Sequence, residues 1–179
     1  RGVSARIAAY RTHDGTGQGR LDASRFRRMT PSLSSRIIRS WLAASIVVCT
    51  TIATAAAPAP ERFRVRLETT KGDIVIAVQR DLAPIGVDRF HELVRIGYYD
   101  DVAFSRVIAN KWAQFGINGN PRVSTAWRSR TIPDDPFKEP NVRGTVAFAF
   151  AVPNGRTTQV FINLADNRQT HDREPFVPF

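Results

Sequence analysis

Residues 104–116 run FSRVIANKWAQFG, two short and largely apolar segments on either side of a polar centre. Ala109 and Asn110 lie between the two segments, where the sequence predicts a turn. We therefore predict two short strands that end near Phe115. Further short strands are predicted on both sides of this unit.

Residues 62–79, which lie upstream, have the pattern of a β-hairpin. Apolar and charged residues alternate over 63–67, and the alternation resumes over 74–78. This period of two is typical of strands with one buried face. Residues 70–73, Thr-Lys-Gly-Asp, supply the turn between the two strands.

One helix is predicted between the hairpin and residues 104–116. Pro84 opens it at a position where a missing N–H costs nothing, and Gly97 is a natural stop. Its apolar stripe, at helical spacing, consists of Val87, Phe90, Leu93 and Val94.

The downstream part combines a long irregular stretch with two more β-like segments. Residues 116–143 are rich in Gly, Pro and Asp and predict a long loop. Residues 145–151 and 159–164 are apolar and β-like. Many short strands with one helix indicate a mainly antiparallel barrel or sandwich.

The positive charge is concentrated near the N-terminus. The formal net charge is +10, from 26 Lys and Arg against 16 Asp and Glu. Residues 1–57 hold nine Arg and two Asp, which gives +7, so residues 58–179 hold 17 basic and 14 acidic residues, which gives +3. The near balance of the C-terminal part argues against a nucleic-acid-binding surface.

Residues 29–57 have the pattern of an export signal. Met29 is followed by Arg36 and Arg39, and then by the uncharged residues 40–57, which end in two A-x-A cleavage patterns. We therefore expect a periplasmic or secreted protein, with 58–61 as a linker and 1–28 as an upstream extension without a fold of its own. A membrane anchor and a lipoprotein signal at Cys49 are alternatives, and a genuine basic extension is an alternative for 1–28.

Four ordered blocks of the sequence resemble the cyclophilins, which are peptidyl-prolyl cis-trans isomerases. The blocks are 70–74, 89–100, 104–116 and 153–162. Residues 127–136 are further similar to a bacterial subgroup of that family. The blocks cover most of the chain from Arg62 onward, so the resemblance is specific at the level of the family.

The resemblance implies a mainly β fold, a closed antiparallel β-barrel with capping helices. The chain stops before the family's final strand and helix. We therefore expect 62–179 to be an incomplete domain, less stable than a complete one, because an open barrel leaves strand edges unpaired.

The resemblance also implies the substrate and the site. The substrate is an X–Pro bond in a peptide or an unfolded protein, and neither a cofactor nor a metal is needed. Arg106 matches the family's catalytic arginine, and Gln114 matches the glutamine that orients it. Phe161 matches the floor of the proline pocket. The other implied substrate-binding positions are Trp112, Lys111, Ala149, Gln159, Phe176 and His171.

Several positions depart from the family pattern. Lys111 stands where an aromatic pocket residue is usual, although its stem can line a pocket while its ammonium reaches water. Phe150 stands where Asn is usual. His171 takes a Leu position and Phe176 takes a His position. We expect these changes to affect catalytic efficiency more than the fold.

The sequence leaves three functions to compare. The first is an isomerase that acts on exported proteins, as a monomer that is not inserted in the membrane after cleavage. The second is a peptide-binding or chaperone-like module with little catalysis, motivated by Lys111 and the altered pocket. The third is a basic nucleic-acid-binding barrel, against which the charge distribution argues. Cys49 and the three histidines have no metal-ligand spacing.

Overall fold

The computed structural model describes residues 57–174 and 176–179. The predicted extension, and the predicted leader up to residue 56, lie outside the described residues. The elements are β1 (Arg62–Thr69), β2 (Gly72–Gln79), α1 (Pro84–Arg95), β3 (Phe104–Ile108), β4 (Trp112–Phe115), α2 (Pro121–Arg128), β5 (Val146–Phe148), β6 (Val160–Asn163) and α3 (Arg168–His171). The described part contains no helix long and apolar enough to cross a bilayer.

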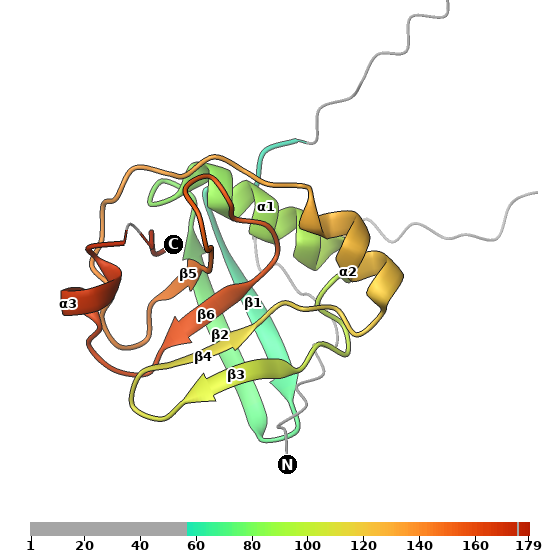
Figure 1. Ribbon diagram of the computed structural model, residues 1–179, viewed down its shortest axis with the longest axis horizontal. Helices are drawn as coiled ribbons and strands as arrows, with labels where there is room; N and C mark the ends of the chain where they lie inside the picture. The colour runs from blue at the N-terminus through green and yellow to red at the C-terminus, as the bar shows by residue number, and fades with distance from the viewer. Residues whose placement is uncertain (1–56, 175) are drawn as a thin grey trace, which may run out of the picture. The chain divides into compact units, whose positions relative to one another are not determined.

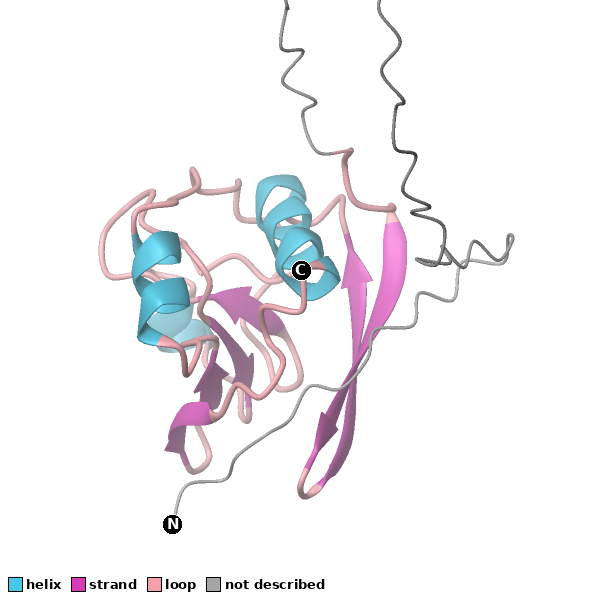
Figure 2. Cartoon of the chain, turned by 90° about the vertical axis from the view of Figure 1, so that its right-hand side faces the viewer, coloured by secondary structure: helices cyan, strands magenta, loops and turns pink. Residues whose placement is uncertain are grey.

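The strands form two antiparallel sheets. β1 and β2 make the predicted hairpin, with Val65 opposite Ile76. The second sheet has the order β3-β4-β6-β5, and Figures 1 and 2 show the hairpin beside it, with α1 near one end of both. The mainly β fold is confirmed, while closure of the sheets into one barrel stays a prediction.

The core lies between α1 and the two sheets. The predicted stripe of α1 is buried, and the inward-facing residues of β1 are buried with it. Phe90 of α1 lies with its ring centroid 5.7 Å from that of Tyr99 and 5.1 Å from that of Phe179. The backbone N–H of Phe179 donates to the carbonyl of Val146 at 3.0 Å. The last residues therefore pack on the core and extend the β5 edge.

A buried ion pair fixes the start of α1. Asp135 accepts hydrogen bonds from the backbone N–H groups of Ile85 (2.9 Å) and Gly86 (2.8 Å). Its carboxylate also accepts from Nη1 of Arg156 at 2.9 Å, and Arg156 is only 2% exposed. Arg156 donates in addition to the carbonyl of Pro133. Asp135, which lies 50 residues after Ile85, thus accepts from N–H groups that the helix itself leaves unpaired.

The prediction that 116–143 is a loop throughout is wrong for residues 121–128, which form α2. The side chain of Asn120 accepts from the N–H of Arg122 at 3.0 Å, and Pro121 occupies the first turn. These residue types are helix-start signals as well as turn signals. The helix is short and buries mainly Trp127, so its apolar period was too brief to be recognised.

Candidate functional site

The sheet brings Arg106, Gln114 and Phe161 into one row across three strands. Arg106 of β3 is paired with Gln114 of β4, and Gln114 is paired with Phe161 of β6. Residues at directly paired positions share a face of the sheet. The two catalytic candidates and the predicted pocket floor are therefore neighbours, although they lie up to 55 residues apart in the sequence.

A β-bulge at Ser105 gives Arg106 its direction. Phe104 is paired with Phe115 and Arg106 with Gln114, so β3 advances by two residues where β4 advances by one. Ser105 is the extra residue. Without the bulge, Phe104 and Arg106 would point to the same face. Phe104 instead packs on the buried ring of Phe115, at 5.2 Å between centroids, and Arg106 faces the site.

Most of the predicted site residues line one cavity of about 150 Å³. They are Arg106, Trp112, Gln114, Ala149, Phe161, His171 and Phe176. Phe150 also lines this cavity, and the sequence analysis noted it only as a departure from the family pattern. Only its position next to Ala149, an implied substrate-binding residue, could have indicated from the sequence that Phe150 lines the cavity.

Aromatic rings form the apolar part of the cavity. The centroid of the Phe161 ring lies 5.1 Å from that of His171 and 5.3 Å from that of Phe176, with edge-on geometry. Phe150 and Phe176 lie closest, at 4.5 Å. Phe161 is 3% exposed, so its ring is a fixed floor.

The polar side of the cavity is formed by Arg106 and Gln114. The guanidinium carbon of Arg106 lies 5.3 Å from the centre of the Trp112 ring, a cation–π contact that limits where the exposed guanidinium can move. Nε2 of Gln114 donates to Oε1 of Gln159 at 2.9 Å, which orients the Gln114 amide. Gln159 does not line the cavity and acts on it through this bond.

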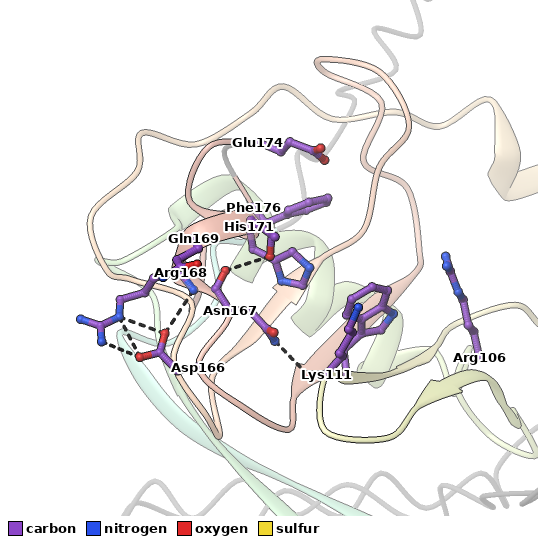
Figure 3. A pocket seen from close by; sticks show the side chains of 11 residues that line it. Arg106, Lys111, Asp166, Asn167, Arg168, Gln169, His171, Glu174 and Phe176 are labelled. Atoms are coloured by element: carbon purple, nitrogen blue, oxygen red, sulfur yellow. Dashed lines mark hydrogen bonds and ion pairs between the residues drawn. The ribbon is translucent and has the colours of Figure 1, made fainter.

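Lys111 lies just outside, in a wider pocket of about 1070 Å³ that adjoins the cavity. The two pockets share Arg106, Trp112, His171 and Phe176. Figure 3 shows this wider pocket, with Lys111 and Arg106 on one side and Glu174 apart from both. Lys111 therefore lies beside the cavity and is not part of its lining.

A network of buried asparagines, which the sequence analysis missed, holds His171 and Phe176 in place. Nδ2 of Asn167 donates to Oδ1 of Asn163 at 2.7 Å and to the carbonyl of Lys111 at 2.8 Å, and Figure 3 shows Asn167 reaching Lys111. Nδ1 of His171 lies 3.2 Å from the same Asn163 oxygen. Nδ2 of Asn141 donates to the carbonyl of Phe176 at 2.8 Å. Asparagine is unusual in strands, so Asn163 in an apolar strand was the available signal.

The burial of His171 predicts that stability depends on pH. Burial lowers the pKa of His171, while Glu174 and Asp172 act in the opposite direction. Below the unfolded pKa of about 6.5, the unfolded chain binds a proton that the folded protein resists. We expect the free energy of unfolding to fall as pH drops from 7.5 to 5.5, measured by urea denaturation.

His171→Asn tests the assignment of this pH dependence. Burial also lowers the pKa of His91, so the variant should lose part of the decline and His91→Asn another part. A decline in His171→Asn as steep as in the wild type would contradict the role of His171.

Comparison with known proteins decides the family. The family model of the cyclophilin type peptidyl-prolyl cis-trans isomerases matches residues 64–177. The chain belongs to this family. A probable peptidyl-prolyl cis-trans isomerase of Brucella abortus is 40% identical over 72% of this chain and 72% of that protein. A peptidyl-prolyl cis-trans isomerase-like 1 protein of Rhizopus delemar is 37% identical over 59% of this chain and 66% of its own length.

Solved structures support the cyclophilin fold. A cyclophilin type isomerase of Cryptosporidium parvum superposes with a TM-score of 0.52 at 23% identity, covering 60% of this chain and 70% of that one. The Mimivirus cyclophilin gives a TM-score of 0.50 at 22% identity, covering 66% and 72%. The family and the enzyme class inferred from the sequence are confirmed. The roles of individual residues in the cyclophilin site stay predictions.

Proposed function

We propose that this chain is a peptidyl-prolyl cis-trans isomerase whose active site is the cavity between Arg106, Gln114 and Phe161. The observation that carries the proposal is the row of these three residues across β3, β4 and β6 along one cavity. It joins a fixed aromatic floor to a permanent cation and an oriented amide.

The chemistry requires no covalent intermediate. Rotation about the peptide C–N bond meets a barrier of about 20 kcal/mol because resonance is lost, so X–Pro isomerisation takes tens of seconds without a catalyst. An enzyme that shortens this to milliseconds stabilises the twisted amide by roughly 5–6 kcal/mol relative to the planar one. Neither a nucleophile nor a general base is needed.

The geometry supports one role for each residue. A cavity of about 150 Å³ accepts a ring of about the size of benzene, and a proline ring is no larger. The ring is held on Phe161 while the residue before proline turns. Arg106 is always charged and carries several donors, so it stabilises the amide as resonance is lost. Gln114, held by Gln159, holds the substrate backbone.

A second function has one observation in its favour. Lys111 replaces an aromatic pocket residue of the family and lies in the wider pocket, outside the cavity. A peptide-binding module with little catalysis would keep the aromatic cavity and bind proline-containing segments. It would be supported if the wild type bound an X–Pro peptide but exchanged its isomers no faster than buffer.

Gln114→Ala tests the isomerase site. We expect kcat/KM on an Ala–Pro peptide to fall about fivefold, since a hydrogen bond between neutral groups contributes roughly 1 kcal/mol. The measurement is the cis–trans exchange rate followed by NMR. Gln79→Ala, an exposed glutamine at the end of β2, is the matched control and should retain full activity. Equal losses in both variants would remove Gln114 from the site.

We further propose that the protein is exported and acts as a monomer on proline-containing and unfolded proteins outside the cytoplasm. The support is the sequence pattern of 29–57, with its two A-x-A sites. Expression from Met29 in a Gram-negative host should give a periplasmic product whose N-terminus is Ala56 or Pro58. An uncleaved product in the cytoplasmic fraction would contradict export.

A further inference from the structure

Lys111 has no ion-pair partner among the charged residues that line the wider pocket beside the cavity. The lining includes three basic side chains, Arg106, Lys111 and Arg168, and two acidic ones, Asp166 and Glu174. Nε of Arg168 donates to Oδ1 of Asp166 at 2.9 Å, and this pair neutralises itself. Glu174 lies apart from Lys111 in the pocket (Figure 3). The side of the pocket next to the cavity is therefore positive.

Lys111 is held in place through its backbone and exposed at its side chain. Its carbonyl accepts from the N–H of Leu164 and from Nδ2 of Asn167, both at 2.8 Å. Its N–H donates to the carbonyl of Ile108 at 3.0 Å. The root of the side chain is thus fixed by bonds that do not depend on the ammonium group. Substitutions at Lys111 can change the charge without removing these bonds.

The distance from Lys111 to the site sets a spacing on the substrate. Lys111 comes directly before β4 and three residues before Gln114. Lys111 itself lies in the turn before the strand, so three residues of chain separate the two positions by at most about 10 Å. An extended peptide covers the same distance in about three residues.

From these observations we propose that Lys111 selects substrates that carry an acidic side chain about three residues from the isomerised proline. The proposal rests on the proposed isomerase function and specifies its substrate class. The carboxylate would pair with the Lys111 ammonium while the proline ring occupies the cavity.

Matched peptides test the proposal. They contain one Ala–Pro bond in an alanine background, with Glu, Gln or Lys three residues after the proline in one series and three residues before it in the other. The exchange rate catalysed by the full chain is measured by NMR at low salt. We expect the Glu peptide of one series to exceed its Gln counterpart by about two- to fivefold, as an exposed ion pair allows. The ratio should approach one in 0.5 M NaCl.

Three variants isolate Lys111. Lys111→Gln should bring the ratio of Glu to Gln peptides to one, and Lys111→Glu should invert the order so that the Lys peptide leads. Arg168→Gln removes the same unit of charge from the far end of the pocket and should keep the wild-type ratio. Equal rates for Glu and Gln peptides in both series, or a preference that survives in Lys111→Gln, would overturn the proposal. If no peptide, including the Gln peptides, exchanged faster than in buffer, the isomerase function itself would fail.

Discussion

Arg106→Ala is expected to lower kcat/KM for X–Pro isomerisation by about 10²-fold or more, the usual cost of removing one donor that acts in the transition state. The guanidinium is the permanent cation of the cavity and is paired across the strands with Gln114. Its loss leaves the apolar floor intact, so KM for a proline peptide should change much less than kcat. The measurement is the NMR exchange rate over a range of peptide concentrations.

Folding gives a separate readout for this variant. Arg106 is exposed, and its guanidinium contacts the ring of Trp112. Because an exposed cation–π contact contributes little, the free energy of unfolding should fall by no more than about 1 kcal/mol. Arg64→Ala, an exposed arginine on β1, is the matched control and should keep both activity and stability. Activity within twofold of the wild type in Arg106→Ala would remove the arginine from the catalytic role.

The largest effect on stability is expected from Asp135→Ala. The variant leaves the buried guanidinium of Arg156 without its closest carboxylate and the N–H groups of Ile85 and Gly86 without an acceptor. Breaking a buried ion pair from one side costs about 3–5 kcal/mol. For a folded region of this size, the melting temperature should fall by roughly 10–20 °C. Thermal unfolding followed by circular dichroism measures the change.

A double variant separates the charge from the cap. Asp135→Leu with Arg156→Met removes both charges of the closest pair and keeps apolar volume, so it should recover part of the loss. A deficit should remain because α1 still lacks its cap and because Asp134, whose Oδ1 lies 3.2 Å from Nε of Arg156, loses its cation. Asp81→Ala, an exposed aspartate, serves as the control and should melt like the wild type. If Asp135→Ala also melted within about 2 °C of the wild type, the buried pair would contribute little.

The sequence around Asp135 does not predict this effect on stability. Asp134-Asp135-Pro136 has the composition of an exposed turn, and Arg156 lies beside Asn154 and Gly155 in another turn-like segment. Local composition describes what each segment can do alone. It does not predict that Asp135 pairs with Arg156, which lies 21 residues away, or that Asp135 caps α1 at Ile85, which lies 50 residues away.

The same contrast applies to the site. The residue types at Arg106, Gln114 and Phe161 were identifiable because they stand in blocks that resemble the family. The bulge at Ser105 was not, although it decides which way Arg106 points, because a bulge is a mismatch between two strands. The asparagine network was equally hidden, since it joins the turn before β4 to β6 and α3 only after they pack.

From the sequence alone follow the hairpin, the boundaries of α1 and the strands β3 and β4, because period-two and helical patterns are properties of consecutive residues. The family and the enzyme class follow from it too, because their blocks are contiguous. The tertiary structure alone decided that α2 forms, that Lys111 lies outside the cavity at Phe161 while Phe150 lines it, and that Asp135 caps α1. Each of these features depends on contacts between residues that are far apart in the sequence. The periodicity of consecutive residues contains no information about such contacts.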